Sequence, residues 1–495
     1  MTRDGPSNVL FVVMDTVRKD HLSAYGYEKP TTPNLAAFAE EATVYDHAVA
    51  PAPWTLPVHA SMFTGEYPSE HGATQENPYL EDATTLAESL SAGGYETACY
   101  SSNAWITPYT HLTDGFDDQD NFFQIMPGDV LSGPLADAWK AMNDNDRLRS
   151  VANRLVQLGN KVHERFASEG GGDTKTPAVV DSTMDFISDA DGPFFSFINL
   201  MDAHLPYHPP EEFQQEFAPR IDTTKVCQNS KEYNCGARDI SDGEWEDIKG
   251  LYDAEIKHID DQLGRLFGWL KSRGVWDDTM VIVCADHGEL HGEHDLYGHE
   301  FCIYDPLVNV PLMVKHPDLE AGARDDETTV ELTDLYHTVL DSAGVSAAAG
   351  GTEVEPTRSL LREEYRQFEG GDYGFVEYHR PVVELRQLEG KAAEAGIELE
   401  KESRFYSRMR AARRPDAKYI RNQFIPDEAY RIDADPGEET NVAGSDDAAV
   451  VETEAVLSEF EEFVGGEWSD VDDEDVLDDM GGEAKDRLRD LGYLG

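Results

Sequence analysis

The stretch Asn8-Val9-Leu10-Phe11-Val12-Val13-Met14, followed directly by Asp15, decides the fold of this chain. An unbroken run of apolar, largely β-branched residues predicts a strand buried on both faces, as in a parallel sheet covered by helices. Similar runs recur at 95–100, 194–200, 279–285 and 310–314. Helical patterns separate them, most clearly from Asp242 to Gly274. We therefore predict an α/β fold with a mostly parallel sheet sandwiched by helices.

The pattern changes along the chain, and these changes predict its division into domains. Residues 117–190 are less regular and suggest an insertion in a large α/β domain that spans 1–375. From 376 to 445 a polar helical stretch, 383–404, precedes short strand patterns, which predicts a small C-terminal α+β subdomain. The remaining residues, 446–495, are rich in acidic groups and are predicted to form an acidic tail.

The chain is strongly acidic. Asp and Glu number 98 against 40 Lys and Arg, a formal net charge of -58, and the acidic residues are spread over the whole length. Such a surface repels itself at ordinary ionic strength but is screened in molar salt. We therefore expect a halophilic protein of a salt-rich cytoplasm, with no secretory signal and no membrane span. The absence of a basic stripe argues against a nucleic-acid partner.

Polar residues follow the predicted strands where ligands bind in open α/β sheets. Asp15 directly follows the first strand, Asp286 and His287 follow the strand at 279–285, and His204 comes shortly after the one at 194–200. We expect Asp15, Asp286 and His287 to hold one divalent metal ion. Carboxylate oxygens favour Mg²⁺, Ca²⁺ or Mn²⁺, whereas an imidazole favours Mn²⁺ or Zn²⁺, so the sequence leaves the metal open.

Thr55 stands at the predicted start of a helix, two residues before Pro57. A hydroxyl there feels the positive end of the helix dipole, and metal coordination would lower its pKa and make it a nucleophile. Threonine is also an ordinary N-cap residue, so these residues alone leave both interpretations open.

Several motifs in order resemble the sulfatase family of the alkaline-phosphatase superfamily. They are Val13 to Leu22, Thr32 to Leu35, Trp54 to Gly65, Asp286 to Glu289 and, near the C-terminus, Tyr430 to Asp433 with Asp435 to Asn441. The resemblance covers most of residues 8–345 and returns near 405–442. It implies an alkaline-phosphatase-like fold and a metal-dependent enzyme that acts on a small anionic ester.

The chain departs from the family pattern at the nucleophile. Sulfatases carry Cys or Ser there, oxidised to formylglycine, whereas this chain has Thr55, so formylglycine is not expected. The motif's arginine is His59, and the second of two adjacent N-terminal acids is Thr16. A lysine expected near Asn103 is absent, and a second substrate lysine is matched by His299.

The remaining set of Asp15, Thr55, Asp286 and His287 resembles the one-metal site of lipoteichoic-acid synthases and phosphoethanolamine transferases, which use an unmodified threonine. The resemblance implies that Thr55 is a metal-bound nucleophile on sulfur or phosphorus. It also implies roles for three histidines: His204 and His299 contact the ester or protonate the leaving group, and His59 positions Thr55.

Three functions follow from this resemblance. The first is a hydrolase of sulfate or phosphate esters. The second is a transferase of a phosphoryl-alcohol group, which would not release inorganic anion without an acceptor. The third is a non-catalytic anion-binding relative, against which the retention of the expected metal ligands argues. The sequence favours the first, and it leaves the alcohol and the oligomeric state open.

Overall fold

The computed structural model describes residues 8–74, 76–81, 83–122, 175–367, 370–466 and 468. Its centre is an eight-stranded sheet, whose strands run in the order β10 (Arg324–Glu331), β2 (Thr43–Val49), β9 (Asn309–Lys315), β6 (Thr279–Cys284), β1 (Asn8–Met14), β5 (Phe194–Leu200), β3 (Glu96–Ser101) and β4 (Asp118–Asn121). Only β9 pairs antiparallel with its neighbours, β2 and β6, while the other pairings in this sheet are parallel. The predicted mostly parallel sheet is confirmed.

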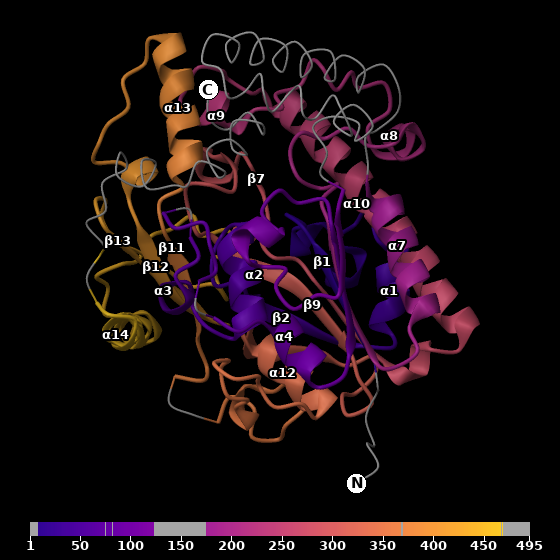
Figure 1. Cartoon of the computed structure of the whole chain (residues 1–495). Coiled ribbons are helices and arrows are strands. Elements are labelled where there is room, and N and C mark those ends of the chain that lie inside the picture. The colour runs from indigo at the N-terminus through magenta and orange to yellow at the C-terminus, as the bar shows by residue number, and fades with distance from the viewer. Residues whose placement is uncertain are drawn as a thin grey trace, which may run out of the picture.

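Two groups of helices flank the sheet on opposite sides (Figure 1). One group is α1 (Pro33–Ala39), α7 (Thr176–Asp189), α8 (Glu211–Phe217) and α10 (Asp242–Arg273). The other is α2 (Thr55–Thr64), α4 (Leu86–Ala92) and α12 (Asp334–Ala343). The longest of the described helices, α10, begins where the Ser241 side chain accepts a hydrogen bond from the amide of Glu244 and ends at Gly274, whose φ of 73° suits a left-handed cap.

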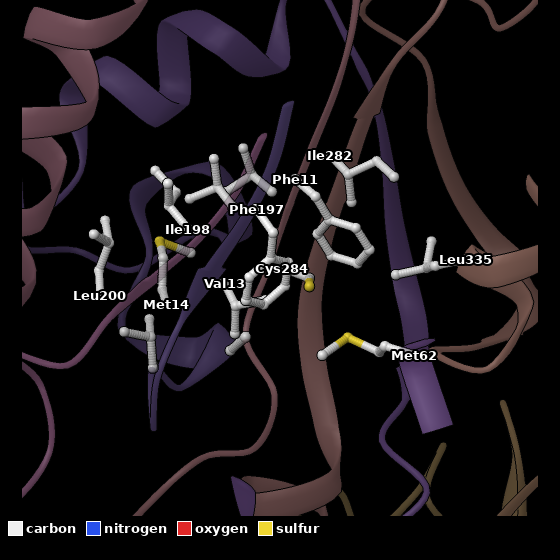
Figure 2. Packing of buried hydrophobic residues seen from close by; sticks show 14 of the residues in the cluster. Phe11, Val13, Met14, Met62, Phe197, Ile198, Leu200, Ile282, Cys284 and Leu335 are labelled. Carbon is white, nitrogen blue, oxygen red and sulfur yellow. The ribbon is translucent and has the colours of Figure 1, made fainter. Parts of the chain in front are cut away.

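The main hydrophobic core lies between the sheet and these helices. Figure 2 shows Phe11 of β1, Phe197 of β5 and Ile282 of β6 near Met62 of α2 and Leu335 of α12. All five side chains are buried. The core fixes the strand ends and the start of α2 relative to one another, which is what a precisely built site requires.

A second sheet lies toward the C-terminus. It is antiparallel, in the order β11 (Gly374–Tyr378), β12 (Met409–Arg414), β13 (Ala417–Asn422) and β14 (Glu428–Tyr430), and it lies beside α13 (Val382–Ala395) and α14 (Ala448–Phe463) (Figure 1). The shorter elements are α3 (Pro68–His71), α9 (Ser230–Asn234), α11 (Asp305–Val308) and the β7 (Leu290–His291) and β8 (Tyr297–Gly298) pair. The predicted α+β character of this region is confirmed.

Two predicted regions differ from the structure. The predicted helix at 383–404 is too long, because α13 ends at Ala395 and Gly396 takes a φ of 71°. The region predicted as an insertion, 117–190, begins with β4 and ends with α7, both packed in the central domain, and 123–174 lie outside the described residues.

The predicted acidic tail contains a packed helix. Helix α14 occupies residues 448–463 and buries Val450, Thr453, Leu457 and Phe460 against the C-terminal sheet. Their spacing of three and four residues places them on one helix face, a pattern that the surrounding acidic residues obscured. In the part of the chain that the structure describes, no helix has the length and apolar character needed to cross a membrane.

Candidate active site

Four neighbouring strands deliver polar side chains to one edge of the central sheet. Asp15 follows β1 and Asp286 follows β6, while Asn199 lies at the end of β5 and Asn103 comes just after β3. Strands β6, β1, β5 and β3 are adjacent and parallel, so their carboxyl ends lie together. This is the edge at which open α/β sheets bind ligands.

Asp15, Asp286 and His287 form a candidate metal site. One ligand atom from each lies within 4.8 Å of the other two, and all three residues are buried. Asp15 Oδ1, Asp286 Oδ2 and His287 Nε2 have no hydrogen-bond partner among the described residues. The His287 Nδ1–H donates to the Gly288 carbonyl over 3.0 Å, so in the neutral ring the lone pair of Nε2 is available to a metal ion. Buried polar atoms are normally paired, so this donor set fits a divalent cation.

The second oxygen of each carboxylate is held in place. Asp15 Oδ2 accepts hydrogen bonds from the side-chain amides of Asn103 at 2.8 Å and Asn199 at 3.2 Å. Asp286 Oδ1 accepts from the backbone amides of His287 at 2.9 Å and Thr16 at 3.3 Å. These contacts orient the unpaired oxygens toward a common point, as outer hydrogen bonds do around metal ligands.

Thr16, which occupies the position of a second acid in the sulfatase pattern, contributes through its backbone. Its hydroxyl donates to the Asp15 carbonyl over 2.7 Å, and its φ is 58°. A β-branched residue in the left-handed region is strained, and such strain persists where surrounding contacts hold it. Here the Tyr252 hydroxyl donates to the Thr16 carbonyl over 2.7 Å. The turn therefore aims the Thr16 amide at Asp286.

Burial shifts the pKa values of Asp286 and His287, two of the candidate metal ligands. It raises the pKa of Asp286 well above its usual value, and the nearby charge of Asp15 raises it further. Burial lowers the pKa of His287 well below its usual value, and the neighbouring His299 adds to this. His287 is thus neutral at neutral pH, the form in which an imidazole binds a metal.

Thr55 is the first residue of α2, directly after the extended cap residue Trp54. Its Oγ1 accepts a hydrogen bond from the Asn103 side-chain amide at 3.1 Å, so one amide nitrogen joins Thr55 to Asp15. The hydroxyl also lies at the positive end of the α2 dipole, which stabilises negative charge on it. Thr55 lines a pocket together with Asn103, His204 and His299.

His59 lies one helical turn after Thr55 in α2. Its Nδ1–H donates to the Thr55 backbone carbonyl over 2.8 Å and lies 3.8 Å from Asp286 Oδ2. Burial lowers the pKa of His59 to about 4, although the Thr55 carbonyl and the charge of Asp15 act in the opposite direction. His59 is therefore a neutral, fully buried residue that contacts the backbone of Thr55.

His299 differs from His59 and His287 because its ring is hydrogen-bonded to a carboxylate. Its Nδ1 lies 3.0 Å from Oε1 of the fully buried Glu289. Burial lowers the pKa of His299, but the charge and hydrogen bond of Glu289, with the charge of Glu300, raise it to about 9. The ring of His204 lies 5.2 Å from that of His299. A charged imidazole thus lines the pocket beside a second histidine.

The structure brings all the residues singled out from the sequence to this one region, and it adds three others. Asn103 and Asn199 hold Asp15, and Glu289 pairs with His299. Asn199 lies in no motif, and the segment of Asn103 was singled out only for the family lysine that it lacks. Glu289 could have been found from its place in the Asp286-His287-Gly288-Glu289 segment.

Comparison with known proteins gives one matching family model and several similar proteins. The sulfatase family model matches residues 7–345. An arylsulfatase of Clostridium perfringens is 25% identical over 75% of this chain and 82% of its own length. A multifunctional alkaline phosphatase superfamily protein of Trinickia caryophylli is 26% identical over 90% of this chain and 92% of its own. The phosphonate monoester hydrolase of Agrobacterium radiobacter superposes with a TM-score of 0.65 at 21% identity, over 93% of this chain and 95% of that one.

Proposed function

This chain belongs to the sulfatase family, and from that premise we propose that it hydrolyses sulfate or phosphate esters with the unmodified Thr55 as its nucleophile. The observation that carries the proposal is the Asn103 amide, which joins the Thr55 hydroxyl to the carboxylate of Asp15. It links the candidate nucleophile directly to a candidate metal ligand.

Asp15, Asp286 and His287 would hold one divalent ion, whose chemistry is to stabilise negative charge on the transferring group. Asn103 donates to the Thr55 oxygen and the α2 N-terminus favours its anionic form, so both support its attack in line on sulfur or phosphorus. Thr55 lines the pocket, so its proton can pass to water.

His299 serves as the acid in this mechanism. Its pKa of about 9 keeps it protonated at neutral pH, and it lies at the pocket wall beside His204. As the bond from sulfur or phosphorus to the alcohol breaks, His299 protonates the departing oxygen. Water then hydrolyses the ester on Thr55 and releases sulfate or phosphate, or a phosphate monoester where the substrate is a diester. His59 positions Thr55 through its hydrogen bond to the Thr55 backbone carbonyl.

Replacing Thr55 with Ala tests the assignment. Turnover should be abolished, while the three metal ligands keep their partners and the purified variant retains its metal by elemental analysis. Thr64→Ala, at the other end of α2, is the matched control and should retain turnover. Unchanged turnover in Thr55→Ala would overturn the nucleophile assignment. Release of inorganic anion without an added acceptor separates hydrolysis from group transfer.

A further inference from the structure

The C-terminal motif from Asp435 to Asn441 has no part in the chemistry at Thr55, yet it contains a buried carboxylate. Glu438 is 1% exposed, whereas its neighbour Glu439 is exposed. The φ of Glu438 is 54°, in the left-handed region, which is uncommon for a residue other than glycine. A buried carboxylate and such a backbone conformation are both costly unless other contacts hold them. The partners of Glu438 therefore indicate what the motif does.

Glu438 holds the start of α11. Its Oε2 accepts a hydrogen bond from the backbone amide of Asp305 at 2.6 Å, and its Oε1 lies 2.8 Å from Lys418 Nζ. Asp305 is the first residue of α11, and the first amides of a helix have no acceptor within it. Lys418 and Arg413 also pair with the Asp305 carboxylate, at 3.0 and 2.9 Å. All four side chains are buried, and they tie α11 to the C-terminal sheet.

Helix α11 in turn contacts the metal loop, residues 285–289 between β6 and β7. The Gly288 amide donates to the Leu307 carbonyl over 2.8 Å. The two backbones are so close that a Cβ at Gly288 would lie 2.0 Å from the Pro306 carbonyl oxygen. Gly288 follows the candidate ligand His287, and its own carbonyl accepts the hydrogen bond that orients the imidazole. The position of α11 therefore bears on the orientation of His287.

Apolar packing also joins α11 to the C-terminal sheet. Leu307 of α11 and Ile420 of β13 belong to one buried cluster. Successive residues of a strand point to opposite faces, so Lys418 shares the face of Ile420, whereas Tyr419 lies on the other. Tyr419 packs in a separate cluster with Phe460 of α14. The sheet thus contacts α11 through one face and α14 through the other.

We propose that Glu438 is a positioning residue of the metal site, through which the C-terminal sheet holds α11 against the metal loop and keeps His287 in the orientation that binds the ion. The inference goes beyond the chemistry at Thr55 and rests only on the metal site of the proposed function. It assigns a role to a motif that lies outside residues 7–345, which the family model matches.

The first test needs no metal. Hydrogen exchange of the metal-free protein in high salt is followed by mass spectrometry over residues 285–308, which contain the metal loop and α11. Glu438→Ala should speed exchange there by about tenfold or more, because α11 loses a hydrogen bond to a charged group. Glu439→Ala, the same change at the exposed neighbour, should leave it unchanged. Exchange in Glu438→Ala as slow as in the wild type would overturn the proposal.

The second test measures affinity for Mn²⁺, an ion suited to carboxylate ligands. Calorimetry is performed in high KCl, and the binding that persists in Asp286→Asn is subtracted, because an acidic surface also attracts cations. Affinity should fall about tenfold in Glu438→Ala, the lower end of the loss for groups that orient metal ligands. Phe460→Ala, on the other face of the sheet, weakens the fold but should keep the affinity. Equal losses in these two variants, or none in Glu438→Ala, would overturn the proposal.

Glu438→Gln provides a second variant that keeps the volume of the side chain, in case Glu438→Ala does not fold. Its single oxygen can accept from Asp305 or from Lys418 but not from both, so both tests should show smaller losses of the same sign. A Glu438→Gln protein that matches the wild type in exchange and in affinity would also overturn the proposal.

Failure of this inference and failure of the proposed function give different results. Wild-type protein that binds no more Mn²⁺ than Asp286→Asn would refute the metal site, and with it both proposals. Wild-type protein that binds Mn²⁺ at this site, with unchanged affinity in Glu438→Ala, would refute the positioning role alone.

Discussion

Asn103 connects the two halves of the candidate site at the scale of a single residue. Its amide donates to both Asp15 and Thr55, whereas Asn199 donates to Asp15 but has no contact with Thr55 among the hydrogen bonds of the described residues. Asn103→Ala should lower kcat by about 10- to 100-fold, the cost of losing a hydrogen bond of about 1.5–3 kcal/mol that favours the anionic form of the Thr55 oxygen. Asn199→Ala should affect metal affinity more than kcat. Steady-state kinetics at saturating metal checks this, and equal losses of kcat in the two variants would contradict it.

Metal binding should release a proton. Burial and the charge of Asp15 raise the pKa of Asp286, which favours the protonated carboxyl in the metal-free site, and a bound cation favours the carboxylate. His287 has a lowered pKa and contributes none. Metal affinity should therefore fall as the pH falls. Calorimetric titrations in two buffers of different ionisation enthalpy measure the proton count, and a heat that is independent of the buffer would contradict the expected release.

The sequence predicts part of the site at this scale. Asp15, Asp286 and His287 follow buried strands, and neighbouring parallel strands must end at one edge, so their meeting is predictable. Asn103 and Asn199 could not be identified, because their roles depend on hydrogen bonds of their side chains. No spacing rule distinguishes an asparagine that holds a carboxylate from one that caps a turn.

At the scale of the element, α14 anchors the C-terminal sheet. The Phe460 ring stacks on Phe375, with centroids 4.2 Å apart, and meets Tyr67 edge to face. Phe460→Ala should destabilise the protein by about 3–5 kcal/mol through the cavity it leaves. Phe463, with 65% of its surface exposed, is the matched control, and its change to Ala should stay within about 0.5 kcal/mol. Denaturant unfolding in high salt checks both, and equal effects would contradict the packing.

Strand prediction succeeded where burial is complete. β1, β5 and β6 are buried throughout, and their apolar runs indicate them directly. β2 and β10 were not predicted, because β10 begins Arg324-Asp325-Asp326-Glu327 and β2 carries Asp46 and His47 in mid-strand. Strands toward the margin of a sheet expose part of their length, so their sequences lose the apolar signal.

At the scale of the whole molecule, the net charge of -58 should make stability depend on salt. The Debye length falls from about 10 Å at 0.1 M salt to about 3 Å at 1 M, which screens repulsion among surface carboxylates. The melting temperature should therefore rise with KCl concentration. Thermal unfolding over a KCl series measures it, and a flat or falling melting temperature would contradict halophilic adaptation.

The most direct test of the central claim, that unmodified Thr55 is the nucleophile, is peptide mass spectrometry after brief incubation with an aryl sulfate or an aryl phosphodiester in high salt and an acid quench. We predict that the peptide containing Thr55 gains the mass of a sulfuryl or esterified phosphoryl group, and that Thr55→Ala shows no such adduct. Product release from the wild-type protein with the group on another residue, or with Thr55 unmodified throughout the reaction, would contradict the claim.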